Sequence, residues 1–264
     1  MPGRTEPTPR VSVVMPAYNS AGTLLDSAQS VLDQTFADLE LVVVDDSSTD
    51  TTPNLLARLA GRDPRVRVIR LEGRNGPARA RNAALDVARG RYVAFCDADD
   101  LWLPEKLARQ LALAEESGAP LVYSGYHRID AGFTGGAAAF RPAGRVVRVP
   151  TTLTRAELLR RNAVGCLTAM YDRDRTGEVR MPDIPGAEDW ALWLRILRGG
   201  GTAVGIDEPL ALYRTAQPGS HSAQRWRAVQ AVWRVLREEE GLSVPAAAVH
   251  LVTDAIAALR KGTI

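Results

Sequence analysis

The chain has 264 residues, of which 45% are hydrophobic and 24% charged, and its formal net charge at pH 7 is +2. These values are ordinary for a globular protein, and a net charge so close to zero gives no support to a nucleic-acid-binding function. The length suits one large α/β domain with room for a small appendage.

Membrane spans and disulfides are not expected. No stretch approaches the ~20 apolar residues that cross a bilayer, and the first residues contain no apolar signal region. The two cysteines, Cys96 and Cys166, both lie in apolar runs, which predicts buried free thiols of the kind found in a reducing compartment. We therefore expect a cytoplasmic protein, with peripheral contact at the cytoplasmic face of a membrane as an open alternative.

From residue 10 onwards, predicted strands and helices alternate. Residues 1–9, rich in Pro and Thr, form a tail that we expect to be disordered. Strands are predicted over 11–15, 39–44, 66–69, 91–96 and 121–124, and helices over 23–34, 51–59, 77–88 and 104–117. This alternation predicts a mostly parallel sheet with right-handed crossovers and helices on both faces.

The alternation breaks down after residue 125. The pattern predicts a loop over 132–144, a short helix over 154–162, a strand over 166–171, a helix over 186–197, a strand over 202–213 and closing helices over 224–240 and 245–260. In the first closing helix, Trp226, Val229, Trp233 and Leu236 share one face. That face indicates packing against the main domain or, because arginines surround it, contact with an anionic membrane.

Polar residues gather where three of the predicted strands end, which is where open α/β sheets bind their ligands. The densest group is Asp97, Asp99 and Asp100. Carboxylates so close together repel one another unless a cation compensates, and a divalent ion shared with a phosphorylated ligand would do so. A turn in which Asp caps the following helix explains the same residues without a ligand.

Six segments, in this order and spacing, resemble the family 2 glycosyltransferases, which have the GT-A fold. They cover residues 11–19, 30–36, 41–50, 76–82, 97–104 and 188–194. One position departs from the family pattern, because Ser47 follows the Asp45-Asp46 pair where the family usually has Gly. We expect the backbone at Ser47 to keep a negative φ, which a turn allows.

The resemblance implies a GT-A domain over residues 10–221, with a nucleotide-binding half (10–125) and an acceptor-binding half (126–221), followed by C-terminal helices over 222–264. It implies an inverting transferase of hexosyl type that uses a nucleotide-diphosphate sugar, with a uridine or thymidine diphosphate carrier, and Mg²⁺ or Mn²⁺. The acceptor stays open between a glycan, a lipid-linked sugar, a secondary metabolite and a peptide.

Site residues follow from the same resemblance. Asp97, Asp99 and Asp100 resemble the DxD element, in which Asp99 and Asp100 would hold the metal while Asp97 orients the turn. Asp189, early in a helix, would be the catalytic base. The residues implied for nucleotide binding are Pro16, Ala17, Tyr18, Asn19, Asp45, Asp46, Arg81, Asn82, Asp97, Ala98 and Asp99.

Two of these nucleotide contacts have a chemical reason: the Tyr18 ring can stack on a base, and Asp46 can accept an imide N–H. Asp45 could instead cap the turn after it. The residues implied for the acceptor pocket or for a lid over the donor, formed by segment 215–220, are Glu188, Trp190, Arg214 and His221.

Two other classes of protein share part of this pattern. A sugar nucleotidylyltransferase also has an α/β layout with metal-binding carboxylates, but it needs a Gly-rich basic loop after the first strand, where this chain has Pro16-Ala17-Tyr18-Asn19-Ser20. A receiver-like module begins with a strand similar to residues 42–46, yet here a β-α unit precedes that strand. A non-catalytic sugar-nucleotide-binding protein would not need Asp99, Asp100 and Asp189.

Overall fold

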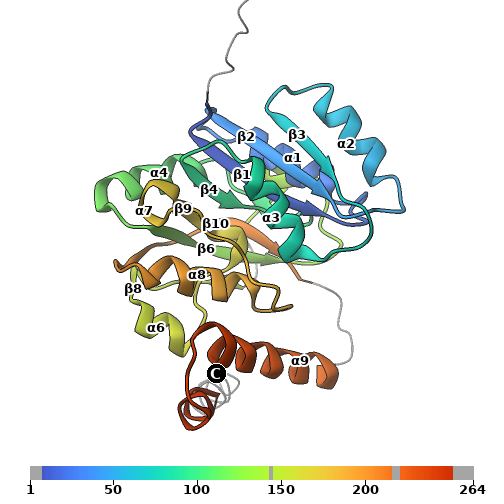
Figure 1. Cartoon of the computed structure of the whole chain (residues 1–264). Helices are drawn as coiled ribbons and strands as arrows, with labels where there is room; N and C mark the ends of the chain where they lie inside the picture. The colour runs from blue at the N-terminus through green and yellow to red at the C-terminus, as the bar shows by residue number, and fades with distance from the viewer. Residues whose placement is uncertain (1–7, 143–144, 216–220, 252–264) are drawn as a thin grey trace, which may run out of the picture.

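One mixed sheet of ten strands organises the protein, and helices cover both of its faces (Figure 1). Its strands run in the order β3-β2-β1-β4-β9-β6-β10-β5, with β7 beside β6 and β8 beside β10. The computed structural model describes residues 8–142, 145–215 and 221–251, without the side chains of 221–225. Most of the predicted tail over 1–9 lies outside these ranges.

The first half confirms the predicted β-α alternation, and its four strands run parallel to one another. Its strands are β1 (Val11–Ala17), β2 (Leu39–Asp45), β3 (Val66–Arg70) and β4 (Tyr92–Phe95). Its helices are α1 (Leu24–Leu32), α2 (Thr52–Ala60), α3 (Pro77–Val87) and α4 (Lys106–Ser117). Parallel neighbours place the carboxyl ends of the strands at one edge of the sheet.

The second half adds short antiparallel pairings to the mostly parallel sheet that the sequence predicted. The fifth predicted strand, β6 (Leu121–Ile129), does not lie beside β4, because β9 (Met170–Asp172) is inserted between them and is antiparallel to both. β10 (Ala203–Arg214) runs parallel to β6, and β5 (Leu101–Trp102) is antiparallel to β10.

Short elements fill the remainder of this half. They are β7 (Val146–Val147), β8 (Thr152–Leu153), α5 (Gly136–Ala139), α6 (Arg155–Arg160), α7 (Arg173–Thr176) and α8 (Glu188–Arg198). The strand predicted over 166–171 is wrong in its first half: Cys166–Thr168 form a 3₁₀ turn, since the Thr168 amide and hydroxyl both donate to the Gly165 carbonyl. The predicted loop over 132–144 contains α5.

Side chains alternate across the strands and build a core on each face of the sheet. Val14, Val42 and Val44 pack in one core with residues of α3 and α8, whereas Val13 and Val43 pack in the other with residues of α1, α2 and α4. Of the two free cysteines, Cys96 is buried as predicted and Cys166 is half-buried. Burial raises the pKa of both thiols well above the usual value, so both stay neutral.

The chain continues into α9 (His221–Arg234), which ends in a π-helical turn over Val235–Glu239. The predicted packing face is only half right: Leu236 is buried and Trp233 half-buried, but Trp226 and Val229 are 64% and 42% exposed. Residues 244–251 are helical, and the rest of the predicted helix over 245–260 lies outside the described residues. Within the described ranges, every helix is too short or too polar to cross a bilayer.

Candidate active site

Three cavities lie in series along the carboxyl-end edge of the sheet, with volumes of about 350, 270 and 480 Å³. Arg81 and Asp97 line both the first cavity and the middle one. Tyr126, Gly165 and Asp189 line both the middle cavity and the third. Shared walls of this kind make the three cavities one groove, with Asp97 at its first junction and Asp189 at its second.

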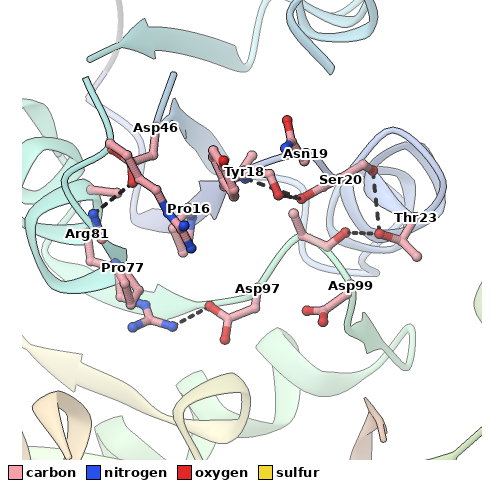
Figure 2. Close-up of a pocket in the computed structure, with 15 residues that line it drawn as sticks. Pro16, Tyr18, Asn19, Ser20, Thr23, Asp46, Pro77, Arg81, Asp97 and Asp99 are labelled. Carbon is pink, nitrogen blue, oxygen red and sulfur yellow. Dashed lines mark hydrogen bonds and ion pairs between the residues drawn. The ribbon is translucent and has the colours of Figure 1, made fainter. Parts of the chain in front are cut away.

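The first cavity collects most of the residues predicted to bind a nucleotide (Figure 2). Those that line it are Pro16, Ala17, Tyr18, Asn19, Asp46, Arg81, Asp97, Ala98 and Asp99. They come from the end of β1, the end of β2, the start of α3 and the loop after β4. The remaining two, Asp45 and Asn82, lie elsewhere.

Tyr18 presents an aromatic face at this cavity. Its side chain is 38% exposed, and the Arg74 guanidinium carbon lies 4.5 Å from the ring centroid. A planar base can stack on such a ring, and Arg74 adds positive charge beside it. Arg74 lines the cavity too but belongs to no motif, so no sequence signal pointed to it.

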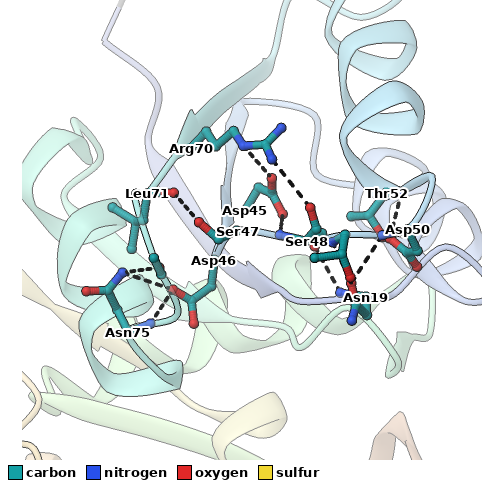
Figure 3. Close-up of polar contacts among 12 residues, drawn as sticks. Asn19, Asp45, Asp46, Ser47, Ser48, Asp50, Thr52, Arg70, Leu71 and Asn75 are labelled. Carbon is teal, nitrogen blue, oxygen red and sulfur yellow. Dashed lines mark hydrogen bonds and ion pairs between the residues drawn. The ribbon is translucent and has the colours of Figure 1, made fainter.

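The two carboxylates that end β2 have different surroundings because neighbouring side chains on a strand point to opposite faces (Figure 3). Asp46 lines the cavity and accepts the backbone N–H groups of Asn75 and Gly76, each at 2.8 Å. Asp45 lines none of the three cavities; it accepts the Ser48 N–H at 3.0 Å and lies 3.5 Å from the Arg70 guanidinium. Asp45 therefore caps the turn, and its predicted place at the nucleotide is wrong.

The expected negative φ at Ser47 is also wrong. Ser47 adopts φ +60°, the left-handed conformation that glycine tolerates best. Its hydroxyl donates to the Leu71 carbonyl at 2.7 Å, which compensates in part for the strain (Figure 3). The turn after Asp45-Asp46 therefore has a positive φ at the position where the family pattern has glycine.

The carboxylates after β4 occupy three different positions on the groove. Asp99 lines the first cavity, Asp100 the middle one, and Asp97 both. Asp97 is paired with Arg81 at 2.5 Å, and Asp100 accepts the Arg214 N–H at 2.9 Å. Burial and the charge of Asp97 raise the pKa of Asp99, and they raise that of Asp100 further.

Arg214, predicted to flank a lid, is buried and serves the carboxylate loop instead. Its guanidinium donates to the backbone carbonyls of Asp99 at 2.8 Å and Phe133 at 2.6 Å. It therefore fixes the loop after β4 to the end of β10 and to the loop after β6. The lid segment itself, residues 216–220, lies outside the described residues, as does the side chain of His221.

Asn82 has a structural partner in place of a ligand. Its amide donates to the Met181 carbonyl and accepts the Met181 N–H, both at 2.9 Å, and it lines none of the three cavities. The nucleotide contact predicted for Asn82 is therefore wrong. Its neighbour Arg79 is exposed and lies 3.7 Å from Asp183, as expected of a solvated helix face.

Asp189 and Glu188 open α8 and face the groove. The pKa of Asp189 is raised to about 6, mainly because its carboxyl is removed from water, and its Oδ1 accepts the Trp190 N–H at 2.6 Å. Glu188 lines the middle cavity, accepts the Gly186 N–H at 2.7 Å and lies 3.5 Å from Arg81. A carboxyl with a pKa near neutrality is suited to accept a proton at physiological pH.

Trp190 does not form an acceptor wall, contrary to the prediction. Its ring is buried in the core, and its indole N–H donates to the Leu158 carbonyl at 2.9 Å, which ties α8 to α6. The aromatic walls of the middle cavity are Tyr126 and Tyr213, whose ring centroids lie 5.8 Å apart. Neither tyrosine belongs to a motif, and only the pairing of β6 with β10 shows that they meet.

No three or more His, Cys, Asp or Glu side chains form a preformed metal-binding group within the described ranges. Asp99 nevertheless has a carboxylate to which no other described residue donates a hydrogen bond or an ion pair. Asp99 and Asp100 together offer carboxylate oxygens to an ion such as Mg²⁺, which would complete its shell with phosphate and water.

Comparison with known proteins identifies the class of this protein. Residues 12–171, more than half of the chain, match glycosyl transferase family 2. The chain therefore belongs to family 2 of the glycosyltransferases, and it is an enzyme of the transferase class with a GT-A fold. The comparisons favour neither a nucleotidylyltransferase nor a receiver-like module.

Several relatives match over most of their length, among them TuaG and WfgD. A putative teichuronic acid biosynthesis glycosyltransferase, TuaG of Bacillus subtilis, is 40% identical over 89% of this chain and 90% of its own. WfgD of Escherichia coli, a UDP-Glc:alpha-D-GlcNAc-diphosphoundecaprenol beta-1,3-glucosyltransferase, is 34% identical over 86% of this chain and 85% of its own.

The solved structures that share the fold include two with a bound nucleotide sugar. TarS 1–349 of S. aureus in complex with UDP-GlcNAc has a TM-score of 0.67 at 20% identity and covers 92% of this chain and 70% of its own. The mannosyltransferase PcManGT of Pyrobaculum calidifontis, in complex with GDP-Man and Mn²⁺, has a TM-score of 0.67 at 23% identity and covers 97% of this chain and 75% of its own.

Proposed function

We propose that this glycosyltransferase transfers a hexose with inversion, and that the groove binds the substrates in the order of its cavities. The nucleotide diphosphate lies in the first cavity, the transferred sugar in the middle one and the acceptor in the third. The observation that carries this order is the position of Asp189, which borders the middle and third cavities, whereas Asp99 borders the first and Asp97 the first and the middle.

The reacting hydroxyl of the acceptor lies at Asp189. Its oxygen forms a bond to the anomeric carbon of the donor while the bond from that carbon to the diphosphate oxygen breaks. The hydroxyl proton passes to the Asp189 carboxylate, whose orientation is held by the Trp190 N–H on Oδ1. Attack from the side opposite the leaving group inverts the anomeric centre.

A divalent cation fits the donor side, with Asp99 and Asp100 as its candidate ligands. Bound there, it would offset the negative charge that develops on the departing diphosphate. Arg81 neutralises Asp97 and extends toward Glu188, so its charge also lies between the first and middle cavities.

A uracil or thymine base suits the first cavity, since Tyr18 offers a stacking face there and Asp46 a carboxylate. Asp46 Oδ1 already accepts the backbone and side-chain N–H groups of Asn75, whereas Oδ2 accepts only the Gly76 N–H and can accept a further hydrogen bond. The solved relative TarS binds UDP-GlcNAc, which agrees with a uridine carrier.

The acceptor is a lipid-linked saccharide, as in the reaction named for WfgD. The exposed Trp226 and Val229 of α9 then give the enzyme a peripheral contact with the membrane that carries this acceptor. We expect the reaction to take place at the cytoplasmic face.

Hydrolysis of nucleotide sugars in the absence of acceptor tests this function. We expect turnover of UDP- or dTDP-hexoses that requires Mn²⁺ or Mg²⁺, stops with EDTA and is competed by UDP more strongly than by CDP. Asp99→Asn should lower the rate about 10²-fold or more, because it removes a group that acts on the leaving diphosphate. Undiminished hydrolysis with EDTA, or equal competition by UDP and CDP, would contradict the metal or the base assignment respectively.

A further inference from the structure

The third cavity is bordered by arginines that the reaction, as derived so far, does not use. Arg161 lines this cavity together with Tyr126 and Asp189. Arg128 follows Tyr126 by two residues on β6, so both side chains lie on the same face of the sheet. The Arg128 N–H donates to the Arg145 carbonyl at 3.0 Å, which places Arg145 opposite Arg128 at the start of β7.

These three residues, Arg128, Arg145 and Arg161, form what we call the arginine cluster. Burial raises the pKa of the Tyr126 hydroxyl, and the positive charges of all three arginines act on it in the opposite direction. Like charges placed opposite each other on neighbouring strands destabilise a sheet. An anion bound between them would remove that repulsion.

In the part of the chain that the structure describes, no carboxylate forms an ion pair with the arginine cluster. Glu157 lines the third cavity but binds Thr154, and Asp130 lines the cavity of Arg128 and Arg145. Nearby arginines differ in this respect: Arg148 lies 3.3 Å from Asp207, and Arg109 lies 2.7 Å from Glu208. Arg148 also lines the third cavity, so the paired Arg148 and the unpaired Arg161 border the same space. Arg128 and Arg145 line another cavity, of about 860 Å³. The unpaired ones remain available to a ligand.

We propose that the arginine cluster binds a diphosphate that joins the acceptor sugar to its lipid, an inference that rests on the proposed function. The acceptor sugar then lies between Asp189 and the tyrosine pair Tyr126 and Tyr213, with its reacting hydroxyl at Asp189. Its anomeric oxygen, and the diphosphate attached to it, point past Tyr126 toward the cluster. Guanidinium groups match phosphate oxygens in charge and in the geometry of paired hydrogen bonds.

A soluble diphosphate without sugar tests this site directly. The probe is decyl diphosphate below its micelle concentration, with UDP and Mn²⁺ present so that the first cavity is filled, and its Kd is measured by titration calorimetry. The double variant Arg145→Gln/Arg161→Gln should bind about ten-fold more weakly or worse, because each lost charge-assisted hydrogen bond weakens binding. Arg160→Gln, an exposed neighbour on α6 that lines none of the cavities, is the matched control and should change Kd less than two-fold.

Two further measurements separate the alternatives. Asp46→Asn should leave the Kd of decyl diphosphate unchanged; if it weakens binding while the double variant does not, the probe occupies the nucleotide cavity and the inference is wrong. If the double variant loses binding to anionic phospholipid vesicles but keeps decyl diphosphate affinity, the cluster contacts lipid headgroups, which also overturns it.

Hydrolysis of nucleotide sugars by the same variants keeps the two proposals apart. The double variant should retain wild-type hydrolysis, since its residues lie at the acceptor end. A wild-type enzyme that hydrolyses no nucleotide sugar, yet binds decyl diphosphate through the cluster, would contradict the proposed function and leave the diphosphate site standing.

Discussion

The ionised carboxylate of Asp189 is expected to lower the stability of the folded protein at neutral pH, because this carboxyl is removed from water. Its carboxyl has a pKa of about 6 in the folded protein, against about 3.9 in an unfolded chain. The folded state therefore binds the proton more tightly, so stability is lost as the pH rises from about 4 to 6 and stays lost above it. An amide in place of this carboxyl could not ionise, and that penalty would disappear.

Asp189→Asn should therefore be inactive and more stable. We expect transfer to fall by about 10²–10⁴-fold, and the variant to exceed wild type by about 1–2 kcal/mol at pH 7.5, an effect reduced by the partial exposure of the side chain. The stability difference should shrink at pH 4.5. Thermal melts at both pH values and kcat/KM against pH, with an acid limb near pH 6 in wild type, measure these effects. Wild-type activity in the variant would remove Asp189 from the mechanism.

At single positions, the motifs identified residues that line the groove, but they did not predict the contacts that each residue makes. The motifs grouped Asp46, Asp97 and Asp99 at one site, and all three line the first cavity. They could not separate Asp45 from Asp46, because the distinction depends on which face of β2 each side chain takes. Ser47 shows the same limit: the hydrogen bond to Leu71 that supports its positive φ joins residues 24 positions apart.

At the scale of elements, β-branched runs predicted the parallel strands of the first half most clearly at β1 and β2, which are seven residues long and buried on both faces. The place of β9 in the sheet could not be predicted. This strand has three residues, and its place depends on pairing with β4, whose residues lie about eighty positions earlier in the chain. Contacts between distant segments decide the second half, and the hydrogen bonds from Asn82 to Met181 are one of them.

Asn82→Ala tests whether that contact is structural. Removal of both hydrogen bonds to Met181 should lower the free energy of unfolding by about 2 kcal/mol, since a buried backbone N–H and carbonyl lose their partner. The KM for the donor should stay within about two-fold, because Asn82 lines none of the three cavities. Chemical denaturation and initial rates measure the two quantities.

The matched control for this variant is Asn54→Ala, an exposed position on α2, which should change stability by less than about 0.5 kcal/mol. A ten-fold rise in donor KM with unchanged stability would restore the nucleotide contact that the motif implied for Asn82.

At the scale of the whole molecule, the C-terminal region is attached to α6 and α8, which contribute residues to the third cavity. Glu240, just after the π-turn, pairs with Arg155 on α6 and with Arg198 on α8. These pairs fix the end of α9 to α6 and α8, whose first residues or flanks line the third cavity; Figure 1 shows α9 on the side of the protein where α6 and α8 lie. The sequence could not predict this, because Tyr126, Arg161 and Asp189, which line that cavity, come from segments with no shared motif. The C-terminal end of α9 is therefore anchored beside α6 and α8.

Trp226→Ser/Val229→Ser should weaken membrane binding and spare the chemistry. Residues 226–230 are all exposed, so the substitutions remove apolar surface without opening the core, which α9 joins only from Ala231 onwards. Because interfacial binding scales with apolar area, we expect co-sedimentation with anionic vesicles to fall roughly three- to ten-fold. Nucleotide-sugar hydrolysis should remain at the wild-type rate. Leu25→Ser, which removes a 45%-exposed side chain from α1, is the control; an equal loss in that variant, or none in the α9 variant, would show that α9 does not contact the membrane.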